Sequence, residues 1–352
     1  MNAIVNETRA PMQATQPHQT HKLKWLLKRE FWENKGGFLW APLITGAIFL
    51  LFTILGGGTG QFMLSRNGAK VMDFEGQQIP LSQVDWDKLI ASASAKDLEQ
   101  YAQVVNGFTL ISGMWPLIVF GFVVFFYLLG SLYDERKDRS VLFWKSMPVS
   151  DGLTVTSKLL TALVVAPVTA ALIAFAVMLA TGIVLSIFIA INGGNPFTIY
   201  WAHLQPLKLL MAIFGWLPVY AFWALPTAGW LMLCSAWAKS KPFLWAVLVP
   251  ILAGVLVVWF GIFSSGNDGD GWFWEHIVAR ALTSAWPGSH LLGYAGTDYF
   301  ERLDDSPNAL YGLDGVLGGL HLFTMPSLWI GALAGAAMIY AAIRLRRWRG
   351  EA

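Results

Sequence analysis

Charged residues are scarce in this 352-residue chain: Asp, Glu, Lys and Arg account for 13% of it, against 55% for hydrophobic residues. The mean hydropathy of +0.52 is higher than a water-soluble globular domain of this length would show. Each of six intervals without a charged residue is longer than the ~20 residues that a helix needs to cross a ~30 Å hydrocarbon layer. The intervals are 36–65, 100–133, 159–207, 209–238, 242–267 and 315–343.

These intervals predict an all-α integral membrane protein with six transmembrane helices. Stretches such as LITGAIFLLFTIL are apolar all round, whereas the strands of a transmembrane barrel alternate apolar and polar residues, so a barrel is excluded. We expect a transmembrane domain over 38–346, between a disordered cytoplasmic tail at 1–20 and a short cytoplasmic tail at 347–352. The expected spans are 38–58, 107–133, 158–190, 207–237, 243–264 and 322–344, and the expected extracytoplasmic loops are 59–106 and 265–321.

Basic residues are sparse in one set of connections, and this sets the expected orientation, because cytoplasmic flanks retain Lys and Arg. If both termini are cytoplasmic, the inner segments hold 17 of the 24 basic residues but eight of the 22 acidic ones. The net charge of +2 hides this difference between the two sides. The C-terminal RLRRWR is the densest group of basic residues on the expected inner side. We therefore expect both termini in the cytoplasm, and a bacterial plasma membrane as the location.

Patterns for catalysis and metal binding are also missing. Cys234 is the single cysteine, which rules out an intramolecular disulfide or a Cys-based metal site. The run GGGTG at 56–60 lacks the Lys of a phosphate-binding loop, and the sequence shows no grouping of nucleophile, base and orienting residue. We expect no catalytic residue, metal site or cofactor, and hence no enzyme. The histidines expected on the outer side are too scattered to suggest a metal site: His203, His276, His290 and His321.

A basic amphipathic helix is expected at 21–37, ahead of the first span. Its apolar residues form a helical stripe that Glu30 interrupts, while two tryptophans lie nearly opposite. Such a helix would lie in the headgroup layer with its basic side toward the lipid phosphates. The alternative, a plain extension of the first span, is disfavoured by the break at Gly36 and Gly37. The residues expected at the membrane interface are Lys24, Trp25, Lys28 and Trp32.

The connection LYDERKDRSVLFWKSMPVSDGLTVTSKLL joins the second and third expected spans. Its early acidic residues suit the positive end of a helix dipole, Pro148 ends that short helix, and Ser150 or Asp151 can cap the next one. Phe143 and Trp144, ringed by basic residues, have the composition of a protein-docking site. A helix that lies on the membrane surface fits the same composition equally well.

The order of a basic amphipathic helix, a first span and this connection resembles the ABC-2 type permeases, the membrane subunits of ABC exporters. The family pattern in the connection is an apolar residue, Glu-Arg, an apolar stretch, Pro-Val-Ser and a Lys that opens the next span. Many members have Gly-Thr-Leu-Glu where this chain has DRSV, which indicates a divergent branch whose substrate cannot be carried over. The matching positions are Leu132, Glu135, Arg136, 141–144, Pro148, Val149, Ser150 and Lys158.

The resemblance implies that the connection is a coupling helix seated on a separate cytoplasmic ATP-binding subunit, which would supply ATP and magnesium. A second permease, identical or related, would complete the transporter, and the segment between the fifth and sixth spans would match the family's re-entrant helices. From its residues alone, that segment is equally an ordinary folded loop. The residues that the resemblance places in coupling are Glu135, Arg136, Arg139, Phe143, Trp144, Lys145 and Pro148.

The expected function is therefore export of a hydrophobic or amphipathic substrate, with lipid and the ATP-binding subunit as partners and no nucleic acid. One alternative is a secondary carrier, which needs paired ionisable side chains inside its spans. Because the interiors of the expected spans lack charge, we expect no such buried group. A second alternative is a membrane scaffold or sensor that transports nothing.

Overall fold

The computed structural model describes residues 22–67, 70–72, 78–80, 86–139, 149–263, 269–292 and 320–349. Three expected features lie outside these residues: the N-terminal tail, the tip of the coupling helix at 140–148, and residues 293–319 ahead of the last span. The position of the coupling-helix tip therefore stays a prediction.

Among the described residues, six helical segments are long and apolar enough to cross a membrane, as the sequence predicts. This is the composition of a multi-pass membrane protein. The segments are Gly36–Gly60, Ala95–Lys137, Asp151–Ile191, Pro206–Trp223, Pro242–Gly261 and Pro326–Trp348.

The described elements are given in chain order. The N-terminal half consists of α1 (Lys22–Glu33), η1 (Gly36–Trp40), α2 (Ala41–Asn67), β1 (Lys70–Met72), β2 (Gln78–Pro80), α3 (Trp86–Ser92), α4 (Ala95–Gly130), α5 (Tyr133–Lys137), α7 (Asp151–Leu160), η3 (Thr161–Val165) and α8 (Ala166–Ile191). The C-terminal half consists of η4 (Phe197–Trp201), α9 (Pro206–Gly215), α10 (Leu217–Trp223), α11 (Leu225–Trp237), α12 (Pro242–Phe263), α13 (Gly269–Phe273), η5 (Trp274–Ala279), α14 (Arg280–Thr283), α15 (Ser289–Leu292), η7 (Leu322–Thr324) and α18 (Pro326–Arg349).

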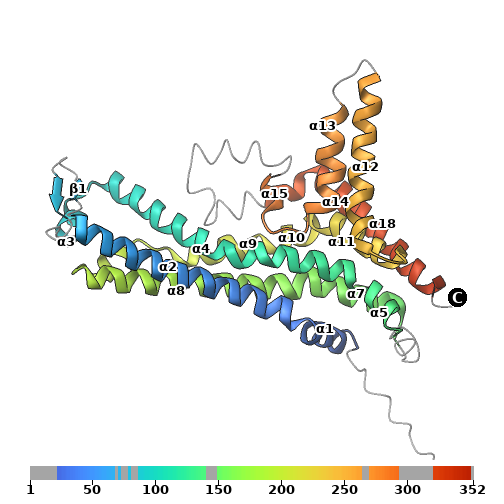
Figure 1. The fold of residues 1–352 in the computed structure, drawn as a ribbon, viewed down its shortest axis with the longest axis horizontal. Helices are drawn as coiled ribbons and strands as arrows, with labels where there is room; N and C mark the ends of the chain where they lie inside the picture. Colours follow the sequence, from blue (N-terminus) through green and yellow to red (C-terminus); the bar gives the residue numbers. More distant parts are fainter. Residues whose placement is uncertain are drawn as a thin grey trace, which may run out of the picture.

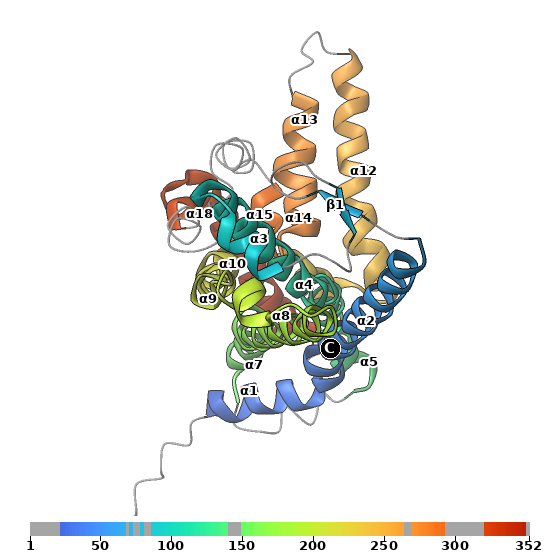
Figure 2. The same ribbon diagram turned by 90° about the vertical axis from the view of Figure 1, so that its left-hand side faces the viewer.

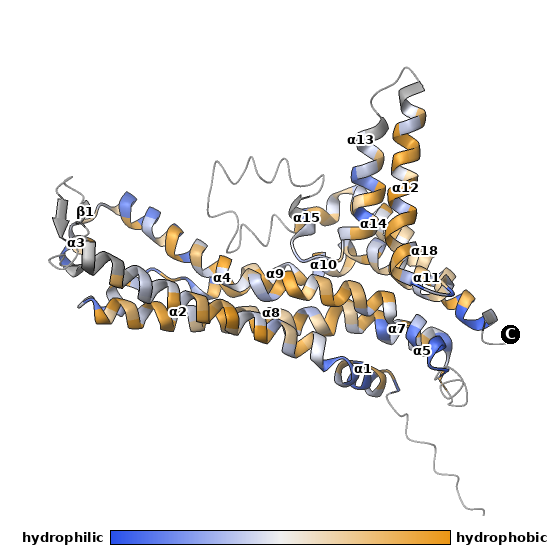
Figure 3. Ribbon diagram, viewed as in Figure 1, coloured by the Kyte–Doolittle hydropathy of each residue, from blue (hydrophilic) through white to orange (hydrophobic). Residues whose placement is uncertain are grey.

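Three long helices, α2, α4 and α8, lie side by side and form the body of the molecule (Figure 1). Helices α11 and α18 pack closely on each other at one end of this body. Helices α12 and α13 project together away from the long axis of the body, as both Figure 1 and Figure 2 show. Figure 3 shows hydrophobic colours along α2, α8 and α12, with hydrophilic residues gathered at α1, α5 and the end of α18.

Three details differ from the sequence-based expectations. The short antiparallel pair of β1 and β2 departs from an entirely helical chain. The second span, expected at 107–133, belongs to a helix that begins earlier: α4 starts at Ala95, after a capping box between Ser94 and Asp97. The fourth expected span, 207–237, is divided into α9, α10 and α11. Pro218 and Pro226 lie in the first turns of α10 and α11, where the missing proline N–H costs least.

Close packing of α11 on α18 depends on small residues, as the spacing of Gly331 and Gly335 indicates. A Cβ atom added to Gly335 would lie 2.3 Å from the carbonyl oxygen of Leu225, and one added to Gly229 would lie 2.4 Å from the carbonyl oxygen of Gly335. Backbone atoms cannot move aside as a flexible side chain can. Glycine at these positions therefore lets the two helices approach each other.

Candidate functional site

Five segments that are far apart in the sequence meet at one end of the molecule, on the right of Figure 1. They are α1, α5, the start of α7, the end of α11 and the end of α18. These are the segments that carry most of the basic residues expected on the inner side. The structure brings them together, and the side of the membrane on which they lie stays a prediction.

A buried group of charged side chains joins four of these segments, and we call it the ion cluster: Glu30, Glu135, Asp151, Lys158 and Arg346. Lys158 Nζ lies 3.0 Å from Glu30 Oε1 and 3.0 Å from Glu135 Oε1. Arg346 Nη1 lies 2.6 Å from Glu135 Oε2, and Arg346 Nε lies 3.0 Å from Asp151 Oδ1. Each cation thus bridges two carboxylates, and Glu135 lies between the two cations.

The ion cluster is shielded from solvent. Glu30 is 1% exposed, Lys158 4% and Arg346 6%. Taking each such charge out of water costs several kcal/mol, which the charge pairs and added hydrogen bonds must offset. Tyr127 contributes one of these bonds, because its hydroxyl donates to Glu30 Oε2 at 3.0 Å. Removing Lys158 would leave Arg29 as the remaining charged partner of Glu30 in a site shielded from solvent.

The ion cluster also ties both flanks of the segment 140–148 to the rest of the chain. Glu135 lies on α5, just before that segment, while Asp151 and Lys158 lie on α7, just after it. Glu30 links these residues to α1, and Arg346 links them to α18. The ion pairs therefore hold both flanks of the segment 140–148 against α1 and α18.

Arg136 fixes α5 to the end of α11. Its guanidinium donates hydrogen bonds to the carbonyl oxygens of Ser235 and Ala238, which the last turn of a helix leaves without a partner in the helix. The Ser235 hydroxyl accepts hydrogen bonds from the backbone N–H groups of Leu132 and Tyr133 at 3.0 and 2.9 Å. The start of the connection is thus held on two sides.

The residues expected to couple therefore divide into two groups. Glu135 and Arg136 point into the protein and hold the base of the connection, while Arg139 is exposed and has a φ of 56°, an unusual value for a non-glycine residue. The others, Phe143, Trp144, Lys145 and Pro148, lie outside the described residues. Ser150, one of the two proposed caps, accepts a hydrogen bond from the N–H of Leu153 and begins α7.

The expectation of no buried ionisable group was wrong. Lys158 lies at the start of the third span and Arg346 at the end of the sixth, so both look like exposed cytoplasmic charges in the sequence. Tertiary packing buries them instead, because each finds a carboxylate on another segment. The sequence did contain one signal, Glu30, which is an acidic residue on the apolar stripe of an amphipathic helix. In the structure, Glu30 attaches that helix to Lys158.

The residues expected at the membrane interface lie on the outside of α1. Trp25 is 63% exposed and Trp32 56%, and Lys24 and Lys28 are exposed or half-exposed beside them. Lys28 Nζ lies 5.4 Å from the ring centroid of Trp25, within the range of a cation–π contact. The opposite face, with Leu26 and Glu30, is buried against the protein. This arrangement suits a helix at a membrane surface.

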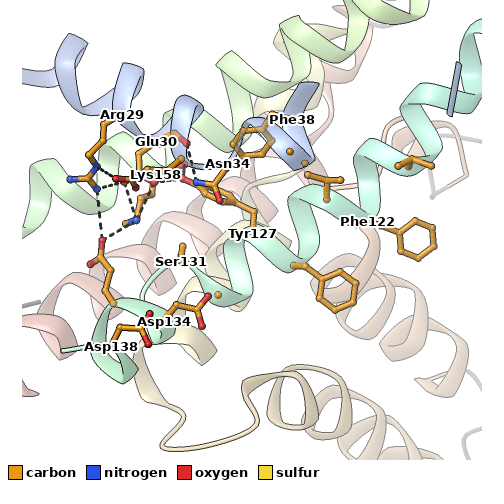
Figure 4. Close-up of a pocket in the computed structure, with 18 residues that line it drawn as sticks. Arg29, Glu30, Asn34, Phe38, Phe122, Tyr127, Ser131, Asp134, Asp138 and Lys158 are labelled. Atoms are coloured by element: carbon orange, nitrogen blue, oxygen red, sulfur yellow. Dashed lines mark hydrogen bonds and ion pairs between the residues drawn. The ribbon is translucent and has the colours of Figure 1, made fainter. Parts of the chain in front are cut away.

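A cavity of about 790 Å³ lies beside the ion cluster, between α1 and η1 on one side and α4 and α5 on the other (Figure 4). One part of its lining is apolar, and the other is polar and rich in carboxylates. The apolar part consists of Phe38, Val119, Phe122, Val123 and Phe126. The ionisable residues of the polar part are Arg29, Glu30, Glu33, Asp134, Glu135, Asp138 and Lys158.

A second buried polar group lies on the other side of the α10–α11 region. The guanidinium carbon of Arg280 lies 4.0 Å from the ring centroid of Trp223, and the His290 ring lies 4.5 Å from that of Trp216. Burial lowers the pKa of Arg280 to about 10 and that of His290 to about 3, because both charged forms lose water. The Arg280 guanidinium also donates from Nη1 to the carbonyl oxygen of Ser327 at 3.0 Å.

Comparisons with known proteins give this chain no relative: no family model, no curated protein and no solved structure matches it. Within the described ranges, His, Cys, Asp and Glu side chains do not gather in any group of three or more that could hold a metal ion. Function must therefore be argued from the arrangement of the chain itself.

Proposed function

We propose that this chain is the permease subunit of an ATP-driven exporter, and that a separate ATP-binding subunit docks on the segment 140–148. The observation that supports the proposal is the ion cluster. It ties both flanks of that segment to each other and to α1 and α18, and the flanks continue along the chain into the long helices α4 and α8, which is what a mechanical input point requires. A loop that only connects two spans does not need five ion-paired charges, three of them buried, at its base.

The proposed mechanism is a rigid displacement. Closure of two ATP-binding subunits would move the segment 140–148 together with α5 and α7, because the ion cluster and Arg136 prevent these helices from moving separately. The long helices α4 and α8 would carry this movement to the far end of the body. Two copies, or two related chains, would then alternate the exposure of the path between them. In this proposal the cell exports a hydrophobic or amphipathic substrate.

The ion cluster also supports a second candidate, a secondary carrier, because paired ionisable groups within spans are typical of ion-coupled transport. Its position argues against this role. The charges lie at the ends of α5, α7 and α18 rather than midway along the spans, and each described cation of the cluster is already shared by two carboxylates. A carrier would move its substrate without an ATPase, which separates the two candidates.

A co-purification experiment tests the proposal. The tagged full-length chain is isolated from membranes of its source, and associated proteins are identified by mass spectrometry together with an assay of ATP hydrolysis. We expect a soluble ATPase to co-purify with the wild-type chain and to be lost from the double variant Phe143→Ala/Trp144→Ala. The matched control is Trp259→Ala/Phe260→Ala, which removes the same two residue types from the exposed surface of α12.

Both variants should still insert into membranes, as measured by their resistance to carbonate extraction. An ATPase that stays bound to Phe143→Ala/Trp144→Ala at the wild-type level would contradict the docking site. Transport in vesicles without any ATPase, driven by an ion gradient, would favour the secondary carrier.

A further inference from the structure

One face of α4 and α5 changes from apolar to acidic along its length. Val119, Phe122 and Phe126 follow one another at helical spacing and lie in the lining of the cavity. Further along the same face, the lining contains Gly130, and then Asp134 and Asp138. Asp138 stays one turn beyond Asp134, because its N–H donates to the carbonyl oxygen of Asp134 at 2.9 Å.

The phenylalanine end of this face is partly open, and its acidic end forms no salt bridge within the described part of the chain. Phe122 is 49% exposed and Phe126 55%, so about half of each side chain stays accessible although Phe122 packs on Trp286 and Phe126 on Phe243. Asp134 and Asp138 form no salt bridge with any residue that the structure describes. Figure 4 shows these two residues on the same side of the cavity, below Ser131.

The cations that line the cavity are both engaged elsewhere. Lys158 binds Glu30 and Glu135, and Arg29 binds Glu30 and Glu33. Five carboxylates therefore face two cations around the cavity, and the excess negative charge lies at the end where Asp134 and Asp138 are. A guest in this space would meet aromatic rings at one end and carboxylates at the other.

From this arrangement we infer that the cavity binds a cationic amphiphile, with its apolar tail against Phe122 and Phe126 and its cationic head between Asp134 and Asp138. The rise of an α-helix places these two ends roughly 18 Å apart, the length of a single alkyl chain of about 14 carbons. The cavity volume of about 790 Å³ is in the range that binds small molecules. Only the statement that this amphiphile is exported cargo depends on the proposed function.

The charges that line the cavity disfavour amphiphiles with other head groups. An anionic head would be repelled by Asp134 and Asp138 and would find Lys158 and Arg29 already paired. A zwitterionic head would bring a negative group to the same carboxylates. A neutral chain would fill the apolar end alone and leave the acidic end to water, so it would gain nothing from half of the cavity.

Direct binding to the unmodified chain is the first test, and it requires no ATPase. The full-length protein is placed in phosphatidylcholine nanodiscs, and binding of tritiated tetradecyltrimethylammonium is measured by scintillation proximity, with empty nanodiscs as the blank. We expect saturable binding that unlabelled tetradecyltrimethylammonium displaces. Tetradecyl sulfate and tetradecylphosphocholine, which have the same chain, should displace at least about tenfold more weakly. Equal displacement by tetradecyl sulfate would overturn the inference without any variant.

Variants then locate the site. Asp134→Asn/Asp138→Asn should weaken binding of the cation by about tenfold, because the variant removes two charge pairs with the cationic head and each solvent-accessible pair contributes modestly. Phe122→Ala/Phe126→Ala should weaken it as well while preserving the preference for a cationic head. The matched control is Glu99→Gln/Glu275→Gln, which neutralises two exposed acids elsewhere and should bind like wild type. Unchanged binding by the Asp134→Asn/Asp138→Asn variant would place the cation elsewhere.

The two proposals fail separately. If the cavity does not bind the cation but an ATPase still co-purifies, the permease proposal still holds. Saturable cation binding by a chain that never associates with an ATPase would retain the cavity and refute the permease.

Discussion

Lys158 is a residue whose environment in the structure differs from the one that its position in the sequence indicates. In the sequence it is a basic residue at the cytoplasmic start of a span, and in the structure it is buried between Glu30 and Glu135. Glu30 alone hinted at this, because an acid on an apolar stripe needs a partner. The identity of that partner could not be predicted, since residues 30 and 158 are brought together only by the packing of α1 on α7.

Replacement of Lys158 by methionine tests whether the ion cluster holds this end together. Lys158→Met keeps the length of the side chain but leaves Glu30 and Glu135 buried without their shared cation, so we expect the free energy of unfolding to fall by about 3–5 kcal/mol. Thermal unfolding in detergent, followed by tryptophan fluorescence, measures the change. Lys208→Met, at an exposed position on α9, is the control and should unfold like wild type. Equal midpoints for both variants would show that the cluster contributes nothing to stability.

His290 gives the stability of the protein a pH dependence with a definite sign. Burial lowers its pKa to about 3 in the folded protein, whereas an unfolded chain takes up the proton below about 6.5. Protonation therefore favours the unfolded state, and stability should fall as the pH drops from about 6.5 toward 3, by about 2 kcal/mol by pH 5. His290→Gln should lose this part of the pH dependence in detergent unfolding experiments. The control is His276→Gln, which replaces a histidine whose ring stacks on Trp272. Identical pH profiles for wild type and His290→Gln would contradict the assignment.

At the scale of elements, hydropathy and helix-breaking residues predicted which helices exist better than they predicted whether each helix is continuous. The helix expected at 21–37 is α1, Lys22–Glu33, followed by the single π-turn η1. The span expected at 207–237 is divided in the structure, because Pro218 and Pro226 each lie in the first turn of a new helix. Proline within an apolar run can be tolerated as a kink or can end a helix, and the outcome depends on neighbouring helices that the local sequence does not specify.

The contact between α11 and α18 is the element-scale feature that a single methyl group should disturb. The added Cβ of Gly335→Ala would meet the backbone of Leu225 and Pro226, so the helices must separate, at a cost of about 1–3 kcal/mol. Thermal unfolding in detergent measures this cost. Gly58→Ala in α2 is a suitable control, because its new methyl group meets no atom within 4 Å and should be neutral or slightly stabilising. If Gly335→Ala is as stable as Gly58→Ala, the close approach of the helices is unimportant.

For the whole molecule, the sequence predicted the number of spans but not their directions. Hydropathy reports length and polarity alone, whereas the direction of α12 depends on contacts with other elements. Trp230 Nε1 donates to the carbonyl oxygen of Ala246 at 2.8 Å, and the Trp274 ring fits against Gly254. These contacts fix α12 beside α11 and η5, so that it projects away from α2, α4 and α8 (Figure 2). Pairings of this kind are specific to the tertiary structure.

The grouping of distant segments at one end makes a prediction about sidedness that does not depend on which side is inner. Residue 24 on α1 and residue 239, next to the carbonyl of Ala238 that Arg136 binds, lie at the end of the ion cluster. Glu99 lies near the other end of α4, roughly 50 Å away by helix rise. With Cys234 replaced by alanine, single cysteines at these three positions can be labelled with a membrane-impermeant maleimide in right-side-out and in inverted vesicles. We expect Lys24→Cys and Lys239→Cys to react from the same side and Glu99→Cys from the opposite side, with cytoplasmic labelling of the first two if the positive-inside assignment holds. Labelling of all three from one side would contradict a membrane-spanning α4, and labelling of Lys24→Cys and Lys239→Cys from opposite sides would contradict the gathering of α1 and α11 at one end.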